Sequence, residues 1–157
     1  MPRSRTKPSV TLDDVSKAII EQLQQDGRRS YAAIGKVVGL SEAAVRQRVQ
    51  RLVDSGVMQV VAVTDPLELG FARQAMVGLK VTGPLDPVAD ALTALDEVDY
   101  VVITAGSFDL LAEVVAESDE HLLSLISDSI RTIPGVVATE TFMYLRLSKQ
   151  TYSWGVR

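Results

Sequence analysis

The apolar residues of this 157-residue chain change their spacing once along its length. From Leu12 to about residue 55 they recur every three or four positions, which is typical of helices packed on one core. From about Gln74 the pattern becomes strand, helix, strand, strand, helix, strand. A run of helices followed by a run of strands and helices is typical of separate packing units, so we expect an α+β protein with two small domains.

The first pattern predicts three helices, near 12–25, 30–38 and 41–55. Ser30 and Ser41 are suited to be N-caps of the second and third helix, and Gly39 is suited to end the second. Two helices joined by the short Gly39-Leu40-Ser41 turn form a helix-turn-helix. The β-branched run 57–64 predicts a strand or a small hairpin, which would be its wing.

The second pattern predicts strands near 74–82, 99–105, 108–116 and 136–147. Helices are expected near 87–96, with Asp86 as N-cap, and near 119–133. The order βαββαβ is that of a ferredoxin-like domain. We therefore divide the chain into a mobile basic arm (1–11), a winged helix-turn-helix (12–63), a linker (64–73) and a ferredoxin-like domain (74–157).

Charge supports the same division. Residues 1–60 hold 10 Lys and Arg against 6 Asp and Glu, whereas residues 61–157 hold 6 against 14. The basic part is suited to phosphate, and the acidic part is not. The chain has no cysteine and only one histidine, His121, for which solvent exposure is expected. No catalytic or metal-ligand spacing is found, so we expect no enzyme activity, no cofactor and no membrane span, and a cytoplasmic location.

The third helix carries the residues that could read DNA. Its face opposite the apolar stripe presents amide and guanidinium groups, which match base edges in a major groove, beside small alanines. Arg48 lies nearer the core and is expected to form a structural ion pair. An ordinary solvated helix face is the alternative. The predicted DNA contacts are Tyr31, Ser41, Ala43, Ala44, Arg46, Gln47, Gln50 and Arg51.

The ferredoxin-like arrangement leaves one face of its sheet without helices. Both sets of alternating residues in the last predicted strand are largely apolar, and the middle strands are apolar on both faces. Since exposed apolar patches usually mark an interface, we expect this face to pack on a second copy. A charge at Met143 or Leu145 is expected to disturb the core or this interface. Tyr152 and Trp154 are expected to pack on a neighbouring subunit.

The loop between the two middle strands is a second candidate site. Gly106 frees the backbone, Ser107 offers a hydroxyl group, and Asp109 offers an acceptor for an ammonium group. A plain hairpin turn, with Asp109 bonded to its own backbone, is the alternative. The residues alone do not decide whether Phe108 lines a pocket or enters the core.

Several short motifs together resemble those of the Lrp/AsnC (feast/famine) transcription regulators of bacteria and archaea. Phe108 departs from the residue usual in that family. The resemblance spans about Leu12 to Lys149 and rests on Leu12-Asp13, Asp26-Gly27-Arg28, Gly39-Leu40-Ser41, Asp65-Pro66, Gly106, Asp109, Pro134-Gly135-Val136, Thr139 and Thr141.

The resemblance implies a winged helix-turn-helix joined to an effector domain, in dimers that assemble further into rings such as octamers. It also implies an amino acid or related metabolite bound near Gly106, Ser107, Phe108 and Asp109, with Thr139 and Thr141 closing the site. The expected function is a sequence-specific, nucleoid-associated transcription regulator that responds to such an effector. The alternative is an architectural protein that wraps DNA without small-molecule control.

Overall fold

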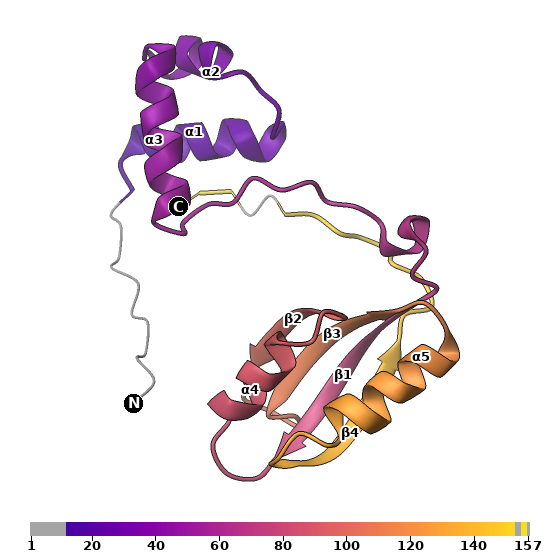
Figure 1. Ribbon diagram of the computed structural model, residues 1–157. Helices are drawn as coiled ribbons and strands as arrows, with labels where there is room; N and C mark the ends of the chain where they lie inside the picture. Colours follow the sequence, from indigo (N-terminus) through magenta and orange to yellow (C-terminus); the bar gives the residue numbers. More distant parts are fainter. Residues whose placement is uncertain (1–11, 153–154, 157) are drawn as a thin grey trace. The chain divides into compact units, whose positions relative to one another are not determined.

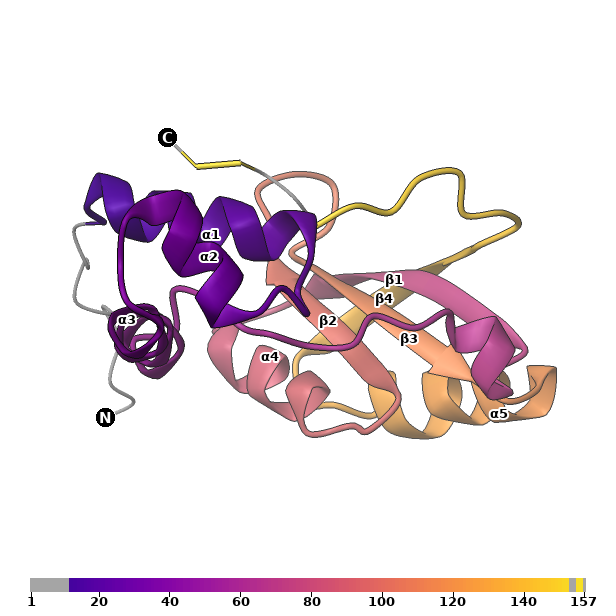
Figure 2. The same ribbon diagram turned by 90° about the horizontal axis from the view of Figure 1, so that it is seen from above.

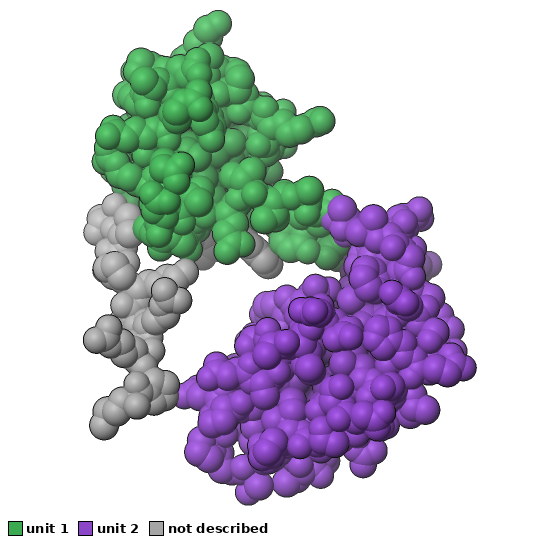
Figure 3. Space-filling view, in the orientation of Figure 1, with its two compact units in different colours: residues 1–63, 149–157 green, residues 64–148 purple. Residues whose placement is uncertain are grey.

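The computed structural model describes residues 12–152, 155 and 156 (Figure 1). The chain forms two compact units, residues 1–63 with 149–157 and residues 64–148, here called unit 1 and unit 2 (Figure 3). The expected domain division, with residues 74–157 in the second domain, stays a prediction. The predicted basic arm and Trp154 lie outside the described residues.

Unit 1 contains α1 (Asp14–Gln25), α2 (Tyr31–Val38) and α3 (Glu42–Asp54). Both predicted serine caps are present, because Ser30 Oγ accepts from Ala33 N and Ser41 Oγ accepts from Ala44 N, each at 3.2 Å. Gly39 ends α2 with a φ of 72°, a conformation that favours glycine. The helices pack on one small core of Ile19, Leu23, Ile34, Val45 and Val49.

The turn between α2 and α3 depends on a second glycine. A Cβ atom placed on Gly35 would lie 2.4 Å from the carbonyl oxygen of Leu40. The Leu40 amide donates to the Gly35 carbonyl at 2.9 Å, so the two backbones are in direct contact. Only glycine allows this approach, and Gly35 was not among the residues predicted to matter for this turn.

The predicted strand or wing at 57–64 is wrong for this chain on its own. The segment has no regular secondary structure, and Val60, Val61 and Val63 are exposed. A strand exists only when a second strand supplies its hydrogen bonds, and none is paired with this segment among the described residues. The β-branched residues of this segment favour a strand, but no second strand is available for them to pair with. A 3₁₀ turn, Pro66–Leu69, follows, with Asp65 as its N-cap.

Unit 2 is built on a four-stranded antiparallel sheet in the order β2-β3-β1-β4. Figures 1 and 2 show α4 and α5 on the same face of this sheet. The predicted ferredoxin-like order of elements is confirmed. The elements are β1 (Arg73–Val81), α4 (Asp86–Thr93), β2 (Val98–Ile103), β3 (Leu110–Ala116), α5 (Asp119–Ser124), a π-helical turn (Leu125–Ile130) and β4 (Val136–Met143).

Three details of unit 2 differ from the expectation. The residue at the cap of α4 is Leu85, without a side-chain hydrogen bond, and Asp86 lies in the first turn. The helix expected to run to residue 133 changes to π-helical geometry at Leu125. β4 ends at Met143, where its register with β1 stops at Ala75, although Tyr144 N still donates to the Gln74 carbonyl at 2.9 Å. Leu145 is therefore outside the sheet and 96% exposed.

Strand register decides which residues share a face of the sheet, since directly paired residues project to the same side. Val77 and Leu79 of β1 are fully buried against α4 and α5, and their partners on β4 are Thr141 and Thr139. The opposite face, here called the bare face, carries no helix of unit 2. It comprises Gln74, Met76, Gly78 and Lys80 of β1, Tyr100 and Val102 of β2, Leu111, Glu113 and Val115 of β3, and Ala138, Glu140 and Phe142 of β4.

Candidate nucleic-acid interface and effector loop

The outward face of α3 gathers most of the predicted DNA contacts. Val45, Val49 and Leu52 are buried, which turns the opposite side of the helix to solvent. Exposed on that side or at its start are Ser41, Ala43, Arg46, Gln47, Gln50 and Arg51, and Ala44 is half-buried. An exposed helix face of guanidinium and amide groups with small residues between them is suited to base edges in a major groove.

Arg46 is the most constrained residue of this face. Its Nη2 donates to Glu42 Oε1, one helical turn earlier, at 2.8 Å. Its guanidinium carbon lies 5.2 Å from the ring centroid of Tyr31, at the start of α2. Tyr31 is half-buried, so the structure gives it a role in packing beside Arg46. Glu42 was not among the predicted residues, although its i, i+4 spacing from Arg46 favours such a pair.

At the other end of α3 a second side-chain pair forms. Gln50 Nε2 donates to Asp54 Oδ1 at 2.8 Å, four residues later. Gln47 and Arg51 have no recorded side-chain hydrogen bond or ion pair among the described residues. α3 therefore presents two internally paired side chains, Arg46 and Gln50, and two unpaired ones.

The prediction that Arg48 is structural is confirmed. Its Nη1 donates to Asp13 Oδ2 at 2.7 Å and to Ser16 Oγ at 3.2 Å, which links α3 to the start of α1. Asp13 also caps α1 by accepting from Ser16 N at 2.8 Å. The hydrogen bonds with Ser16, and then Arg48, lower the pKa of Asp13 to about 2. The Arg48–Asp13 ion pair therefore holds α3 against the start of α1.

The loop 104–109 is held by hydrogen bonds between its two ends. Thr104 N donates to the Asp109 carbonyl at 2.9 Å, and Thr104 Oγ1 donates to the Phe108 carbonyl at 2.5 Å. Gly106 and Ser107 are exposed at its tip. The loop is thus a fixed turn with an open tip.

The Phe108 ring lies on the bare face. A Cβ atom on Gly78 would lie 2.7 Å from the Phe108 ring, so the ring covers Gly78 directly. The ring also meets Phe142 of β4 edge to face, with centroids 5.9 Å apart. Phe108 is therefore not in the core between the sheet and its helices.

Asp109 has a structural partner in this chain. Its Oδ2 accepts from Val81 N at 2.8 Å, and its own amide donates to the Leu79 carbonyl at 2.9 Å. This hydrogen bonding ties the loop to the end of β1. The alternative, in which Asp109 bonds its own turn, is thus not what forms for this oxygen, because its donor is an amide of β1.

Thr139 and Thr141 do not join the loop. Their partners in β1, Leu79 and Val77, are buried on the helix face, whereas Phe108 covers the bare face. The sheet separates the two groups within this unit. The six residues expected to bind an effector therefore do not form one site in a single chain.

A polar cluster lies within the bare face. Gln74 Nε2 donates to Glu113 Oε1 at 2.9 Å, and Tyr144 N donates to the Gln74 carbonyl at 2.9 Å. Burial, and then the nearby Glu113 carboxylate, raise the pKa of Tyr144 to about 12. The same face exposes two aromatic side chains, Tyr100 at 53% and Phe142 at 44%.

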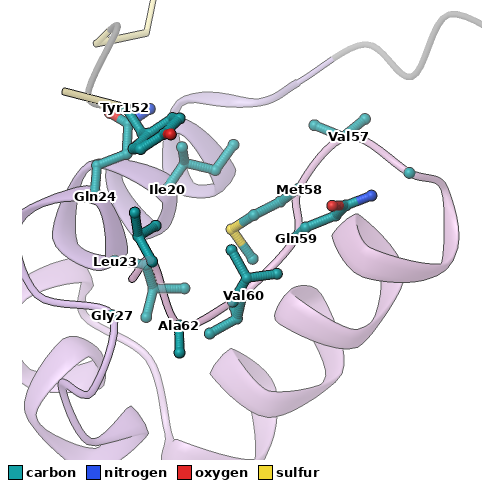
Figure 4. Close-up of a pocket in the computed structure, with 13 residues that line it drawn as sticks. Ile20, Leu23, Gln24, Gly27, Val57, Met58, Gln59, Val60, Ala62 and Tyr152 are labelled. Atoms are coloured by element: carbon teal, nitrogen blue, oxygen red, sulfur yellow. The ribbon is translucent and has the colours of Figure 1, made fainter. Parts of the chain in front are cut away.

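Unit 1 contains a groove of about 750 Å³ between α1 and the segment 56–63 (Figure 4). Ile20, Leu23, Met58 and Val60 line it, and Tyr152 lies at its margin. Among the described residues that line the groove none is charged, so these residues offer a zwitterionic ligand no ion pair.

His121 is half-buried rather than solvent-exposed as expected. Its Nε2 lies 3.3 Å from Glu97 Oε1. Among the described residues no group of three or more His, Cys, Asp or Glu side chains is placed to hold a metal ion. Within the same part of the chain, no helix is long and apolar enough to cross a membrane.

The helix-turn-helix with its exposed third helix, followed by an α+β unit, defines a DNA-binding transcriptional regulator. A family model of the AsnC-type helix-turn-helix domain matches residues 12–53. A second model, described as a C-terminal dimeric alpha+beta barrel domain of AsnC-type regulators, matches residues 71–157. The chain belongs to the Lrp/AsnC family of transcriptional regulators, which confirms the resemblance.

Relatives of known designation agree with this assignment. The chain is 34% identical over 144 residues to the HTH-type transcriptional regulator FL11 of Pyrococcus abyssi, covering 90% of this chain and 95% of the relative. It is 31% identical to the proline dehydrogenase transcriptional activator of Rhizobium radiobacter, covering 89% and 93%. These relatives are regulators and not enzymes.

Solved structures show the same fold. The leucine response regulatory protein LrpA of Mycobacterium tuberculosis matches with a TM-score of 0.81 and 29% identity, over 88% of this chain and 96% of that one. A regulator of Neisseria meningitidis, NMB0573, solved in complex with L-Met, matches with a TM-score of 0.78 and 21% identity, over 94% and 97%. The likeness to the second protein concerns the fold alone.

Proposed function

We propose that this regulator is a homodimer that binds a pseudo-palindromic DNA site through its two α3 helices. The observation that carries the proposal is the outward face of α3, on which Arg46, Gln47, Gln50 and Arg51 are exposed together. In a helix-turn-helix dimer the two reading helices enter successive major grooves, roughly 34 Å apart. Bases would meet the first turns of α3, and phosphates would meet Arg51.

The bare face supports dimerisation through unit 2. Met76, Val102, Leu111, Phe108 and Phe142 form a connected apolar surface that unit 2 itself leaves uncovered. The family model that matches residues 71–157 describes a dimeric alpha+beta barrel domain. A sheet packed on a copy of itself would bury this surface, and larger assemblies such as octamers would then be built from dimers.

We further propose that a small metabolite of the amino-acid class controls the regulator at the loop 106–109. Gly106 and Ser107 offer an exposed amide and hydroxyl group to a carboxylate, and the second oxygen of Asp109 offers an acceptor to an ammonium group. Thr139 and Thr141 lie on the other face of the sheet in one chain, so they could join the site only from another subunit. The L-Met complex of the Neisseria protein gives a precedent on the same fold.

A thermal-shift screen of the twenty amino acids and their derivatives tests the effector proposal. Asp109→Asn is the informative variant, because an amide oxygen can still accept from Val81 N while the negative charge is lost. We expect one compound class to stabilise the wild type and to stabilise this variant much less. If no compound acts, or if both proteins respond alike, the loop is a structural turn.

The DNA proposal is tested separately, by selecting duplexes from a randomised library and then comparing selected with random DNA at two salt concentrations. We expect a selected sequence with two-fold symmetry and a clear preference over random DNA. Equal binding to both would instead identify an architectural protein that binds DNA without sequence preference.

A further inference from the structure

The first turn of the exposed helix carries a carboxylate beside a predicted reading residue. Glu42 is exposed, and its Oε1 lies 2.8 Å from Arg46 Nη2. The Arg46 guanidinium also lies over the Tyr31 ring, so it is held from two sides. Glu42 and Arg46 therefore form one unit at the end of α3 that is expected to enter the groove first.

A carboxylate at this position is unfavourable for DNA binding in general. It faces a polyanion, and in random DNA it loses water without gaining a donor. The penalty is relieved only where a base edge offers an N–H group. In the major groove the pairing suited to Glu is the N4 amino group of cytosine, and the pairing suited to Arg is O6 and N7 of guanine.

We propose that Glu42 is a specificity-determining residue, which accepts from a cytosine N4 while Arg46 donates to a guanine in the same or the adjacent base pair. This inference rests on the proposed DNA-reading role of α3. The Glu42–Arg46 pair of the free protein exchanges its internal hydrogen bond for these two contacts. Glu42 thus disfavours replacement of that cytosine by thymine, whose O4 is an acceptor where the cytosine N4 is a donor. Tyr31 limits where the guanidinium can go.

The opposite end of α3 provides a matched control. Asp54 is also acidic and exposed and also pairs with a residue four positions away, Gln50, at 2.8 Å. It lies in the last turn of the helix, however, away from the turns that meet bases. Removing either acid changes the net charge equally, so a difference between the two variants reports position and not charge.

The experiment uses the full-length protein and a randomised duplex library, followed by direct titrations. Duplexes selected by the wild type are compared with versions in which the single most preferred G·C pair is replaced by A·T. We expect Glu42→Gln to bind random DNA several-fold more tightly than the wild type. We also expect it to lose about tenfold of the discrimination at that pair. Asp54→Asn should tighten binding to both duplexes alike and keep the discrimination.

Two further variants separate reading from helix stability. Glu42→Asp keeps the negative charge in the first turn of the helix but shortens the reach, so it should preserve the thermal stability and still lose discrimination. Tyr31→Phe keeps the ring beside Arg46 and should leave discrimination unchanged, whereas Tyr31→Leu should reduce it. Undiminished discrimination by Glu42→Gln, in a wild type that does select a sequence, would overturn this inference alone. A wild type that selects no sequence would overturn the proposed function as well.

Discussion

The two units of this protein expose opposite kinds of surface. Unit 1 turns a helix face with Arg46, Gln47 and Arg51 to solvent, and unit 2 leaves a sheet face with Tyr100, Leu111 and Phe142 uncovered. A charged surface stays hydrated until it meets an opposite charge, and its binding weakens with salt. An apolar surface gains from permanent burial and is little affected by salt.

From this difference we expect reversible DNA binding by unit 1 and stable dimerisation by unit 2. The two cores also differ in size, since among the described residues unit 2 buries twelve in one cluster and unit 1 buries five. We therefore expect unit 1 to be the less stable unit. The predictions below test this contrast.

The largest effect is expected on the bare face. Leu111→Lys would place a charge beside Gly78 and Val102, in the surface that the proposed dimer buries. An uncompensated buried charge costs about 3 kcal/mol or more, so the dimer should dissociate to a chain of 17.0 kDa in sedimentation equilibrium. Circular dichroism would confirm that the monomer remains folded.

The control for this prediction is Leu145→Lys. Leu145 is apolar and nearby in sequence but lies outside the sheet, and it is 96% exposed. It should leave the mass unchanged, contrary to what the sequence alone suggested for this position. A Leu111→Lys protein that stays dimeric would remove the bare face as the interface.

The next effect compares one glycine from each unit. Gly35→Ala forces a methyl group against the Leu40 backbone, whereas the atoms nearest to the methyl group of Gly78→Ala belong to the Phe108 ring. A backbone cannot rotate away and an aromatic side chain can, so we expect a loss of about 2–3 kcal/mol in unit 1 and about 1 kcal/mol in unit 2. Hydrogen exchange resolves the two units. Equal losses would mean that Phe108 is held as rigidly as the turn.

A smaller effect concerns α3 itself. Arg46→Ala should cost about 1–3 kcal/mol on a selected duplex and little on random DNA, because it removes a contact to a base. Arg51→Ala should weaken binding to both duplexes and reduce the slope of log K against log salt by about one, because it removes a contact to phosphate. Titrations at several salt concentrations measure both. Identical behaviour of the two variants would contradict the assignment of bases and phosphates along the helix.

The smallest effect is the pH dependence of unit 1. The pKa of Asp13 is lowered to about 2, so its ionised form stabilises the folded state at pH values above the ordinary range of a carboxyl group. This contribution is lost as the pH falls from about 4 towards 2. Asp13→Asn should therefore be less stable than the wild type at pH 7, and the two thermal transitions should converge near pH 2. A difference in melting temperature that stays constant across this range would contradict this prediction. It would indicate that Arg48 and Ser16 do not stabilise the protein through the negative charge of Asp13.

Local signals in the sequence determined the helix-turn-helix and the order of elements in unit 2. Ser30, Ser41 and Gly39 act within one helical turn of themselves, so their neighbours in sequence were sufficient to predict two caps and a stop. The outward face of α3 followed from the helical period, and the structural role of Arg48 followed from its place at the edge of that face. The resemblance to the Lrp/AsnC family rested on the same short motifs.

Only the tertiary structure decided the faces of the sheet and the partners of its loops. A shift of one residue in strand register exchanges the two faces, and register depends on pairing between strands far apart in the sequence. Phe108 therefore reached the bare face over Gly78, Thr139 and Thr141 reached the other face, and Asp109 became bonded to Val81. For the same reason the β-branched segment 57–64 formed no strand, since a strand needs a partner that its own sequence does not supply.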